Sequence, residues 1–223
     1  ARFPSRYALH GGPKYSPDGR YVYFGSRDGW VTKYDIYNLE VTAEVRAGIN
    51  MRNIAVSADG HYVLAGNYLP HTLVLLDARD LELIAVIPVE GLNGDTSRVS
   101  AVYTAPPRNS FVAALRDIPE VWEIRWPEVR AAGDAAIVGD FSLHRVEAPD
   151  YLDDFFFDLD YRYIVGAARG GQGGQVFDLD EEVKVADLPL EGMPHLGAGI
   201  TWERDGTRVM AMPHIDKGQV SVF

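Results

Sequence analysis

The chain has 223 residues, 47% of them hydrophobic and 11% aromatic, so it can bury a substantial core and is not disordered. It contains no cysteine, which excludes disulfides, thiolate catalysis and a covalently attached c-type haem within these residues. A formal net charge of -11 argues against nucleic acid or an anionic membrane surface as a partner and favours a basic protein, because phosphate binding depends on clustered Lys and Arg. No run of about 18 apolar residues is present that could span a bilayer.

A repeat begins near the N-terminus. The stretch from Ser16 to Gly25 (SPDGRYVYFG) recurs from Ser57 to Gly66 (SADGHYVLAG). In each copy an S-x-D-G turn precedes a strand, a second turn, another strand and a further alternating stretch, the last two at 31–35 and 41–46 or at 73–77 and 83–89. Four short strands in about 40 residues predict one blade of a β-propeller.

Weaker copies of the repeat continue along the chain. A third blade is expected over 99–126, a fourth over 160–188, and a fifth over 200–223 that stops before its last strand. Residues 127–149 break the period and are interpreted as an irregular insertion between the third and fourth blades. The sequence therefore predicts an all-β chain in which residues 1–223 form a single propeller domain of about five blades.

Superposing the repeats predicts which side chains share a face. In a propeller, the turns joining the second and third strands of each blade lie on the same face as the connections between blades. The turns supply Arg27, Tyr68, His71, Arg116, Arg169 and His214. The connections, which lie nearest the central channel, supply His10, Arg52, Asp153, Asp154 and His195. Gly19, Gly60 and Gly206 are expected in turns on the opposite face.

The converging residues point to a ligand that carries several carboxylates, because the forked guanidinium of arginine matches a carboxylate. An imidazole beside them can ligate iron or transfer protons near neutral pH. Each residue type also has a plainer interpretation, since a single turn arginine is usually solvated and Asp or Tyr often caps backbone groups. His61 and His144 are interpreted as merely exposed, whereas His10 and His195 beside the arginines favour a site.

Six segments carry a resemblance to a known family. They are Ala8–Gly12 (ALHGG), Gly25–Gly29 (GSRDG), Met51–Ala55 (MRNIA), Ala65–Pro70 (AGNYLP), Gly192–Gly199 (GMPHLGAG) and Met212–His214 (MPH). Across essentially the whole chain the sequence resembles the haem d1 propeller of cytochrome cd-type nitrite reductases and of their relatives in haem d1 biosynthesis. The resemblance implies an eight-bladed propeller, of which this chain supplies a fragment, a haem d1-type tetrapyrrole with its iron, and a periplasmic location.

The resemblance also implies residue roles. His10 falls on the proximal iron ligand of the family and His195 on a distal-pocket histidine. Arg27, Arg52 and Tyr68 fall on residues that contact the carboxylates or the edge of the macrocycle, and Arg116, Arg169 and His214 are expected to join them from the turns. The nitrite reductases have a second distal histidine in a Phe-Leu-His-Asp context, where this chain has Tyr-Leu-Asp-Asp at 151–154.

That departure indicates the reaction. One histidine with carboxylates resembles the family's dihydro-haem d1 dehydrogenase, which removes two electrons and two protons from a propionate and leaves an acrylate. His195, Asp153 and Asp154 are the candidate catalytic groups, and the electrons are expected to pass to a c-type cytochrome or to a c-type haem outside this chain.

Three other functions stay open. They are a nitrite reductase domain, a non-enzymatic carrier that hands haem d1 to nitrite reductase, and a plain propeller interaction module. An alternative architecture is a closed five-bladed ring, with residues 2–8 supplying the missing outer strand.

Overall fold

The fold is almost entirely β-structure. A computed structural model describes residues 5–126, 130–132, 135–137, 141–167, 173–190, 195, 199–214 and 217–223. Within these residues the single helical element is the 3-10 turn η1 (Pro106–Arg108). The same part of the chain contains no helix long and apolar enough to cross a membrane.

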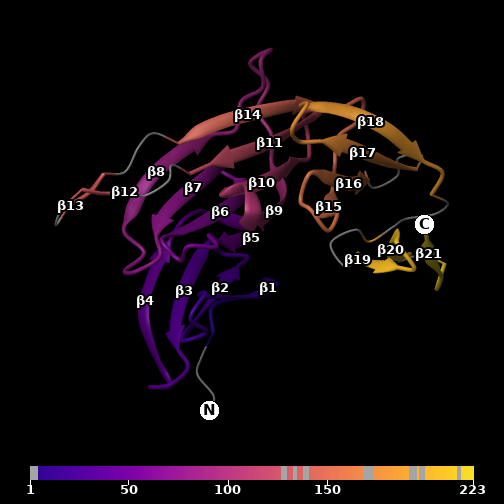
Figure 1. Cartoon of the computed structure of the whole chain (residues 1–223). Helices are drawn as coiled ribbons and strands as arrows, with labels where there is room; N and C mark the ends of the chain where they lie inside the picture. The colour runs from indigo at the N-terminus through magenta and orange to yellow at the C-terminus, as the bar shows by residue number, and fades with distance from the viewer. Residues whose placement is uncertain are drawn as a thin grey trace.

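In the described part of the chain, five antiparallel sheets form successive blades, and a sixth sheet of two strands lies apart from them (Figure 1). The first two blades comprise β1 (Leu9–Tyr15), β2 (Tyr21–Ser26), β3 (Trp30–Asp35) and β4 (Glu40–Arg46), then β5 (Asn50–Val56), β6 (Tyr62–Leu69), β7 (Thr72–Asp77) and β8 (Leu83–Pro88). The third and fourth comprise β9 (Val99–Ala105), β10 (Ser110–Leu115), β11 (Glu120–Arg125) and β14 (Ser142–Glu147), then β15 (Asp154–Phe157), β16 (Tyr163–Ala167), β17 (Gly174–Asp178) and β18 (Val183–Leu188). The fifth has three described strands, β19 (Ile200–Arg204), β20 (Thr207–Pro213) and β21 (Val220–Val222).

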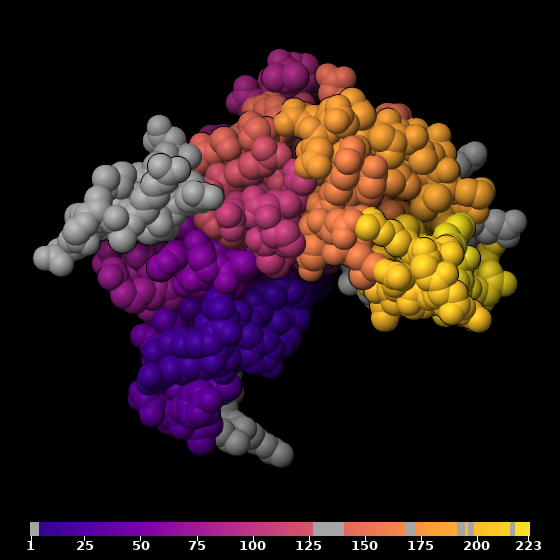
Figure 2. Space-filling model, viewed as in Figure 1, coloured from indigo at the N-terminus to yellow at the C-terminus, as the bar shows by residue number. Residues whose placement is uncertain are grey.

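The blades form an open arc, with the first strand of each blade inside and the last strand outside (Figure 1). Figure 2 shows open space between the first blade, in indigo, and the fifth blade, in yellow. Residues 5–8 join no sheet, and β19–β21 are the described strands of the fifth sheet. The described residues therefore do not form the closed five-bladed ring.

The segment 127–149 differs from its expected position between two blades. Its β14 pairs along its whole length with β11, as the outer strand of the third blade. The insertion thus lies inside that blade and contains the short hairpin of β12 (Arg130–Ala132) and β13 (Ala135–Ile137). His144, interpreted as merely exposed, belongs to β14 and is half-buried, with its Nδ1 2.6 Å from Glu182 Oε1 of the fourth blade.

The middle strands of the second, third and fourth blades are buried on both faces, because each of these blades lies between two others. In the second blade, Val63 and Val74 pack with Tyr23 of the first blade. Leu64, which is 0% exposed, points the other way and packs with Trp122 of the third blade. Because alternate residues of a strand face opposite sides, strands buried on both faces are apolar almost throughout.

The turns between the first and second strands of a blade lie at the end of the sheet away from His10 and His195. Gly19, Gly60 and Gly206 occupy these turns with φ of 69°, 77° and 76°, a left-handed conformation that glycine adopts readily. His10 is near the start of β1, at the other end of that strand. His195 donates its backbone N–H to the last residue of β20, the end of that strand away from its turn. The two faces predicted from the repeats are therefore confirmed.

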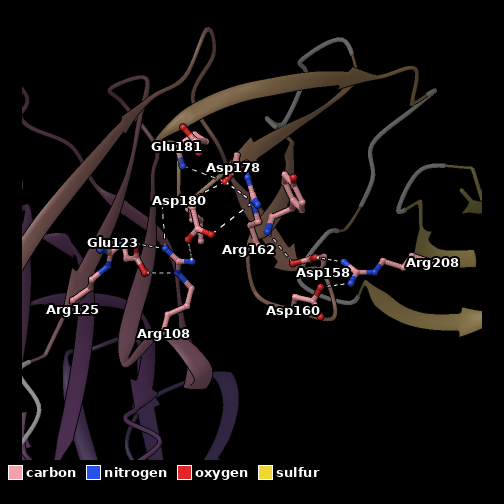
Figure 3. A network of polar contacts seen from close by, with 12 residues as sticks. Arg108, Glu123, Arg125, Asp158, Asp160, Arg162, Asp178, Asp180, Glu181 and Arg208 are labelled. Atoms are coloured by element: carbon pink, nitrogen blue, oxygen red, sulfur yellow. Dashed lines mark hydrogen bonds and ion pairs between the residues drawn. The ribbon is translucent and has the colours of Figure 1, made fainter.

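On the face that carries these turns, ion pairs connect the third, fourth and fifth blades (Figure 3). Arg108 Nε donates to Glu123 Oε1 at 2.7 Å within its own blade, and Arg108 Nη1 donates to Asp180 Oδ1 of the fourth blade at 2.5 Å. Arg208 Nη1 of the fifth blade donates to Asp158 Oδ2 of the fourth at 3.3 Å. Each of these arginines thus has carboxylate partners in the protein.

Truncating Leu64 tests the packing between blades. We expect Leu64→Ala to lower the free energy of unfolding by about 2–5 kcal/mol, because it removes buried methyl groups and leaves a cavity. Leu83→Ala is the matched control, since Leu83 belongs to the outer strand of the same blade and is 61% exposed. Urea unfolding followed by tryptophan fluorescence measures both, and equal losses would contradict the packing described.

Candidate functional site

Four guanidinium groups surround one tyrosine ring. The Cζ atoms of Arg27, Arg52, Arg98 and Arg116 lie 5.8, 5.9, 5.4 and 5.9 Å from the centroid of Tyr68. Tyr68 comes from the end of β6, and the four arginines come from the first blade, β5, the connection before β9 and the turn after β10. The structure therefore brings together four of the predicted residues and adds a fifth.

Arg98 is the residue that the sequence analysis missed. It immediately precedes β9, so it belongs to a connection between blades. Its position could have identified it, because the equivalent connections of the first and second blades supplied His10 and Arg52 as candidate site residues. The third blade was expected to begin at Val99, so Arg98 was not compared with them.

The four arginines differ in their counter-ions. Arg98 Nε donates to Asp117 Oδ2 at 2.8 Å, and Arg116 forms a short ion pair with Asp153. Arg27 and Arg52 have no carboxylate within ion-pair distance among the described residues. Partial burial, together with the charge of Arg52, lowers the pKa of Arg27. Among the described residues, two positive charges therefore lie side by side without a carboxylate at ion-pair distance, although the charge of Arg52 still interacts with Asp154.

The tautomer of His10 follows from its two hydrogen bonds. Its Nε2 lies 2.8 Å from Arg52 Nη1, and its Nδ1 lies 2.7 Å from the backbone oxygen of Arg52. A guanidinium can only donate, so Nε2 is the acceptor and Nδ1 carries the proton that is donated to the carbonyl. Burial and the charges of Arg52 and Arg27 lower the pKa of His10 and favour this neutral form. A neutral imidazole whose Nδ1–H is fixed by a carbonyl is a typical metal ligand through Nε2.

The two neighbouring carboxylates of the fourth blade have different surroundings. Asp153 is paired with Arg116, as described above. Asp154 accepts a hydrogen bond from the Tyr103 hydroxyl at 2.8 Å. Burial raises the pKa of Asp154, and the hydrogen bond from Tyr103 and the charges of His195 and Arg52 partly offset that rise. Asp154 is therefore a poorly solvated carboxylate that lies close to both Arg52 and His195.

The remaining predicted residues are not among those that surround Tyr68. His195 is exposed. His214 is buried, with its Nε2 2.7 Å from Ser221 Oγ of β21, and His71 Nδ1 lies 2.8 Å from Thr96 Oγ1. Arg169 lies outside the described residues.

The site has the donors that an iron tetrapyrrole with carboxylate substituents requires. The Nε2 lone pair of His10 can ligate a metal, and Arg27 and Arg52 can pair with carboxylates. A pocket of about 250 Å³ adjoins His10 and is lined by Leu9, Gly11, Gly12, Pro13, Phe24 and Gly25. A Cβ at Gly12 would meet no atom within 4 Å, so there is open space for a flat ligand near the backbone.

Comparisons with known proteins show which proteins this chain is similar to. Dihydro-heme d1 dehydrogenase of Pseudomonas aeruginosa is 60% identical over 223 residues, which cover 100% of this chain and 43% of that protein. Protein NirF of the same species is 31% identical over 219 residues, covering 92% of this chain and 53% of that protein. Nitrite reductase of Stutzerimonas stutzeri is 29% identical over 206 residues, covering 87% of this chain and 35% of that protein. The chain thus spans about half the length, or less, of these curated relatives.

Solved structures that resemble this chain include a relative of the same name and a more distant protein of similar fold. The structure described as dihydro-heme d1 dehydrogenase NirN in complex with DHE matches with a TM-score of 0.89 at 60% identity, covering 100% of this chain and 46% of that chain. Hydrazine synthase of Kuenenia stuttgartiensis matches with a TM-score of 0.65 at 15% identity, covering 96% of this chain and 58% of that chain, which shows a shared fold alone. The family model described as the cytochrome D1 heme domain matches residues 1–223. With this full-length match, the chain belongs to the cytochrome d1 haem domain family.

Proposed function

We propose that the chain binds dihydro-haem d1 as substrate and forms the tetrapyrrole site of a dihydro-haem d1 dehydrogenase. The observation that carries the proposal is the pair of guanidinium groups of Arg27 and Arg52, which form no ion pair with a described carboxylate, beside the neutral His10. Such a site suits an anionic ligand that also carries a metal. The relative that is 60% identical has this activity as its name, and its structure is described as a complex with DHE.

In this proposal His10 Nε2 ligates the iron of the tetrapyrrole. Arg27 and Arg52 bind its carboxylates, and the ring of Tyr68 lies between these guanidinium groups. Arg116 contributes from the next blade, where its Nη1 lies 3.4 Å from the Tyr68 hydroxyl. Arg169 and His214 belong to the proposed ligand set on the sequence analysis alone.

The reaction breaks two C–H bonds of a propionate and leaves an acrylate, two protons and two electrons. His195, Asp153 and Asp154 are the proposed proton acceptors. We further propose a c-type cytochrome, or a c-type haem outside this chain, as the one-electron acceptor, and the periplasm as the compartment. The resemblance to the family supports both.

The alternatives differ from this function in defined ways. A nitrite reductase domain would use two distal histidines, whereas this chain has Asp153 in place of the second. A carrier that passes haem d1 to nitrite reductase needs His10 and the arginines but no proton acceptor. The experiment with His195 below separates the carrier from the enzyme.

His10→Ala tests the iron ligand. We expect it to abolish the low-spin absorption bands of the bound tetrapyrrole, because the axial imidazole dominates the ligand field of the iron. His61→Ala, at a turn on the opposite face, should leave the spectrum unchanged. Bands that survive in His10→Ala would reassign the ligand, with His195 the next candidate.

Arg27→Gln tests the uncompensated charge. We expect the dissociation constant of the tetrapyrrole to rise about 10- to 100-fold, the usual effect of losing a charge-assisted hydrogen bond, with weaker salt dependence. Arg79→Gln is the control, since Arg79 is exposed and paired with Asp80. Titration followed by visible absorption measures both affinities, and equal values for wild type and Arg27→Gln would exclude a role in carboxylate binding.

His195→Ala separates the dehydrogenase from the carrier. We expect tetrapyrrole affinity to change by only several-fold, because His10 and the arginines supply most of the binding. Formation of the acrylate should slow by about 100- to 10,000-fold, the usual contribution of acid–base catalysis. Asp153→Asn tests the competing acceptor, and comparable losses in both would indicate a coupled pair. A wild-type protein that binds dihydro-haem d1 and, with an electron acceptor present, never oxidises it would leave the carrier as the function.

A further inference from the structure

A cavity of about 270 Å³ that is open to solvent lies among the inner strands of the first four blades. Lys14 of β1, Ala55 of β5, Tyr103 and Thr104 of β9, and Phe155, Phe156 and Phe157 of β15 line it. Water occupies about 30 Å³ per molecule in the liquid, so the cavity has room for several water molecules. The Tyr103 hydroxyl, the Thr104 hydroxyl and the Lys14 amine are the polar groups that could hold them.

Tyr103 stands between this cavity and Asp154. Its ring lines the cavity and packs edge-to-face on Phe155, with the ring centroids 5.1 Å apart. Its hydroxyl donates to Asp154 Oδ1 at 2.8 Å. Lys14 Nζ lies 5.9 Å from the centroid of the same ring and donates to the backbone oxygen of Gly11 at 2.9 Å. Tyr103 therefore lines the cavity and is also hydrogen-bonded to Asp154.

Charged groups on four elements surround Asp154. Arg52 of β5 and His195 lie on the side of the site, and Lys14 of β1 and Tyr103 of β9 lie on the side of the cavity. Burial raises the pKa of Asp154 and makes its carboxylate a better proton acceptor than a solvated one. The hydrogen bond from Tyr103 acts in the opposite direction, because it stabilises the ionised form.

We propose that Asp154 and Tyr103 form the exit route for a proton released from the substrate, and that this route ends at water in the cavity between the inner strands. The proposal rests on the dehydrogenase function. As the carbon–carbon double bond forms, two electrons leave singly to two equivalents of the one-electron acceptor, one proton goes to His195 and the other to Asp154. The Tyr103 hydroxyl, which donates to Asp154 before the reaction, then turns towards the cavity. It gives its proton to water there and accepts the proton of Asp154 on its oxygen.

Tyr103→Phe tests the route, because it keeps the ring against Phe155 and removes only the hydroxyl. We expect tetrapyrrole affinity within about threefold of wild type and turnover at neutral pH lowered about 10- to 100-fold, the lower part of the usual range for proton transfer. Turnover should fall on the acid side where Asp154 becomes protonated. This limb should move to higher pH in the variant, because the hydrogen bond that favours the carboxylate is lost. Tyr15→Phe, at an exposed position of β1, is the control.

A second measurement does not depend on turnover. Infrared pH titration of the ligand-free protein should show a protonated carboxyl band that is absent from Asp154→Asn and that appears at higher pH in Tyr103→Phe than in wild type. Identical titrations and identical pH–rate profiles for wild type and Tyr103→Phe would overturn the proposed proton route and leave the dehydrogenase function standing. A wild-type protein that never oxidises the propionate would overturn the dehydrogenase function and the route with it.

Discussion

The site depends on a constraint of the blade itself. Four antiparallel strands joined by tight turns bring the chain back so that every blade starts its inner strand at the same face. His10, Arg52 and Arg98 are far apart in the chain, yet each stands at or just before the start of an inner strand. The middle strands of the second, third and fourth blades hold that geometry, because each is buried against a blade on either side. The core therefore sets the positions of the charges, although it contributes no functional group.

Charge is distributed differently on the two faces. On the face with the glycine turns, Arg108 and Arg208 each pair with a carboxylate of a neighbouring blade and help to join the blades. On the other face, Arg27 and Arg52 keep their charge in a chain whose net charge is -11. Placing like charges together costs stability when nothing neutralises them. An anionic ligand would remove that cost, and the same feature distinguishes a binding face from a structural one.

The features of the fold that follow from the repeat could be predicted from the sequence. Gly19 and Gly60 mark one turn and so fix the register, the two faces and the convergence of Arg27 with Arg52. The strand β14 was not assigned to the third blade because an insertion moves it out of the period, and its pairing with β11 rather than its spacing defines it. Arg98 was missed because its position depends on which residue begins an inner strand.

Other features of the site depend on contacts that no pattern in one sequence records. The tautomer of His10 is set by two bonds to Arg52, a residue of the next blade. The pair of Tyr103 and Asp154 joins inner strands of two blades, and burial by the surrounding strands determines its chemistry. The sequence could therefore place these residues on a face but could not define their protonation.

The bond between Arg52 and His10 has a consequence for the proposed ligand. While Arg52 donates to Nε2, the lone pair that would meet a metal is occupied, and the adjacent guanidinium groups would repel a bare cation. A carboxylate that drew Arg52 away would uncover the imidazole. In the proposed complex, recognition of the anionic rim would therefore precede coordination at the centre, and it would disfavour free metal ions and macrocycles without an acidic group at that edge.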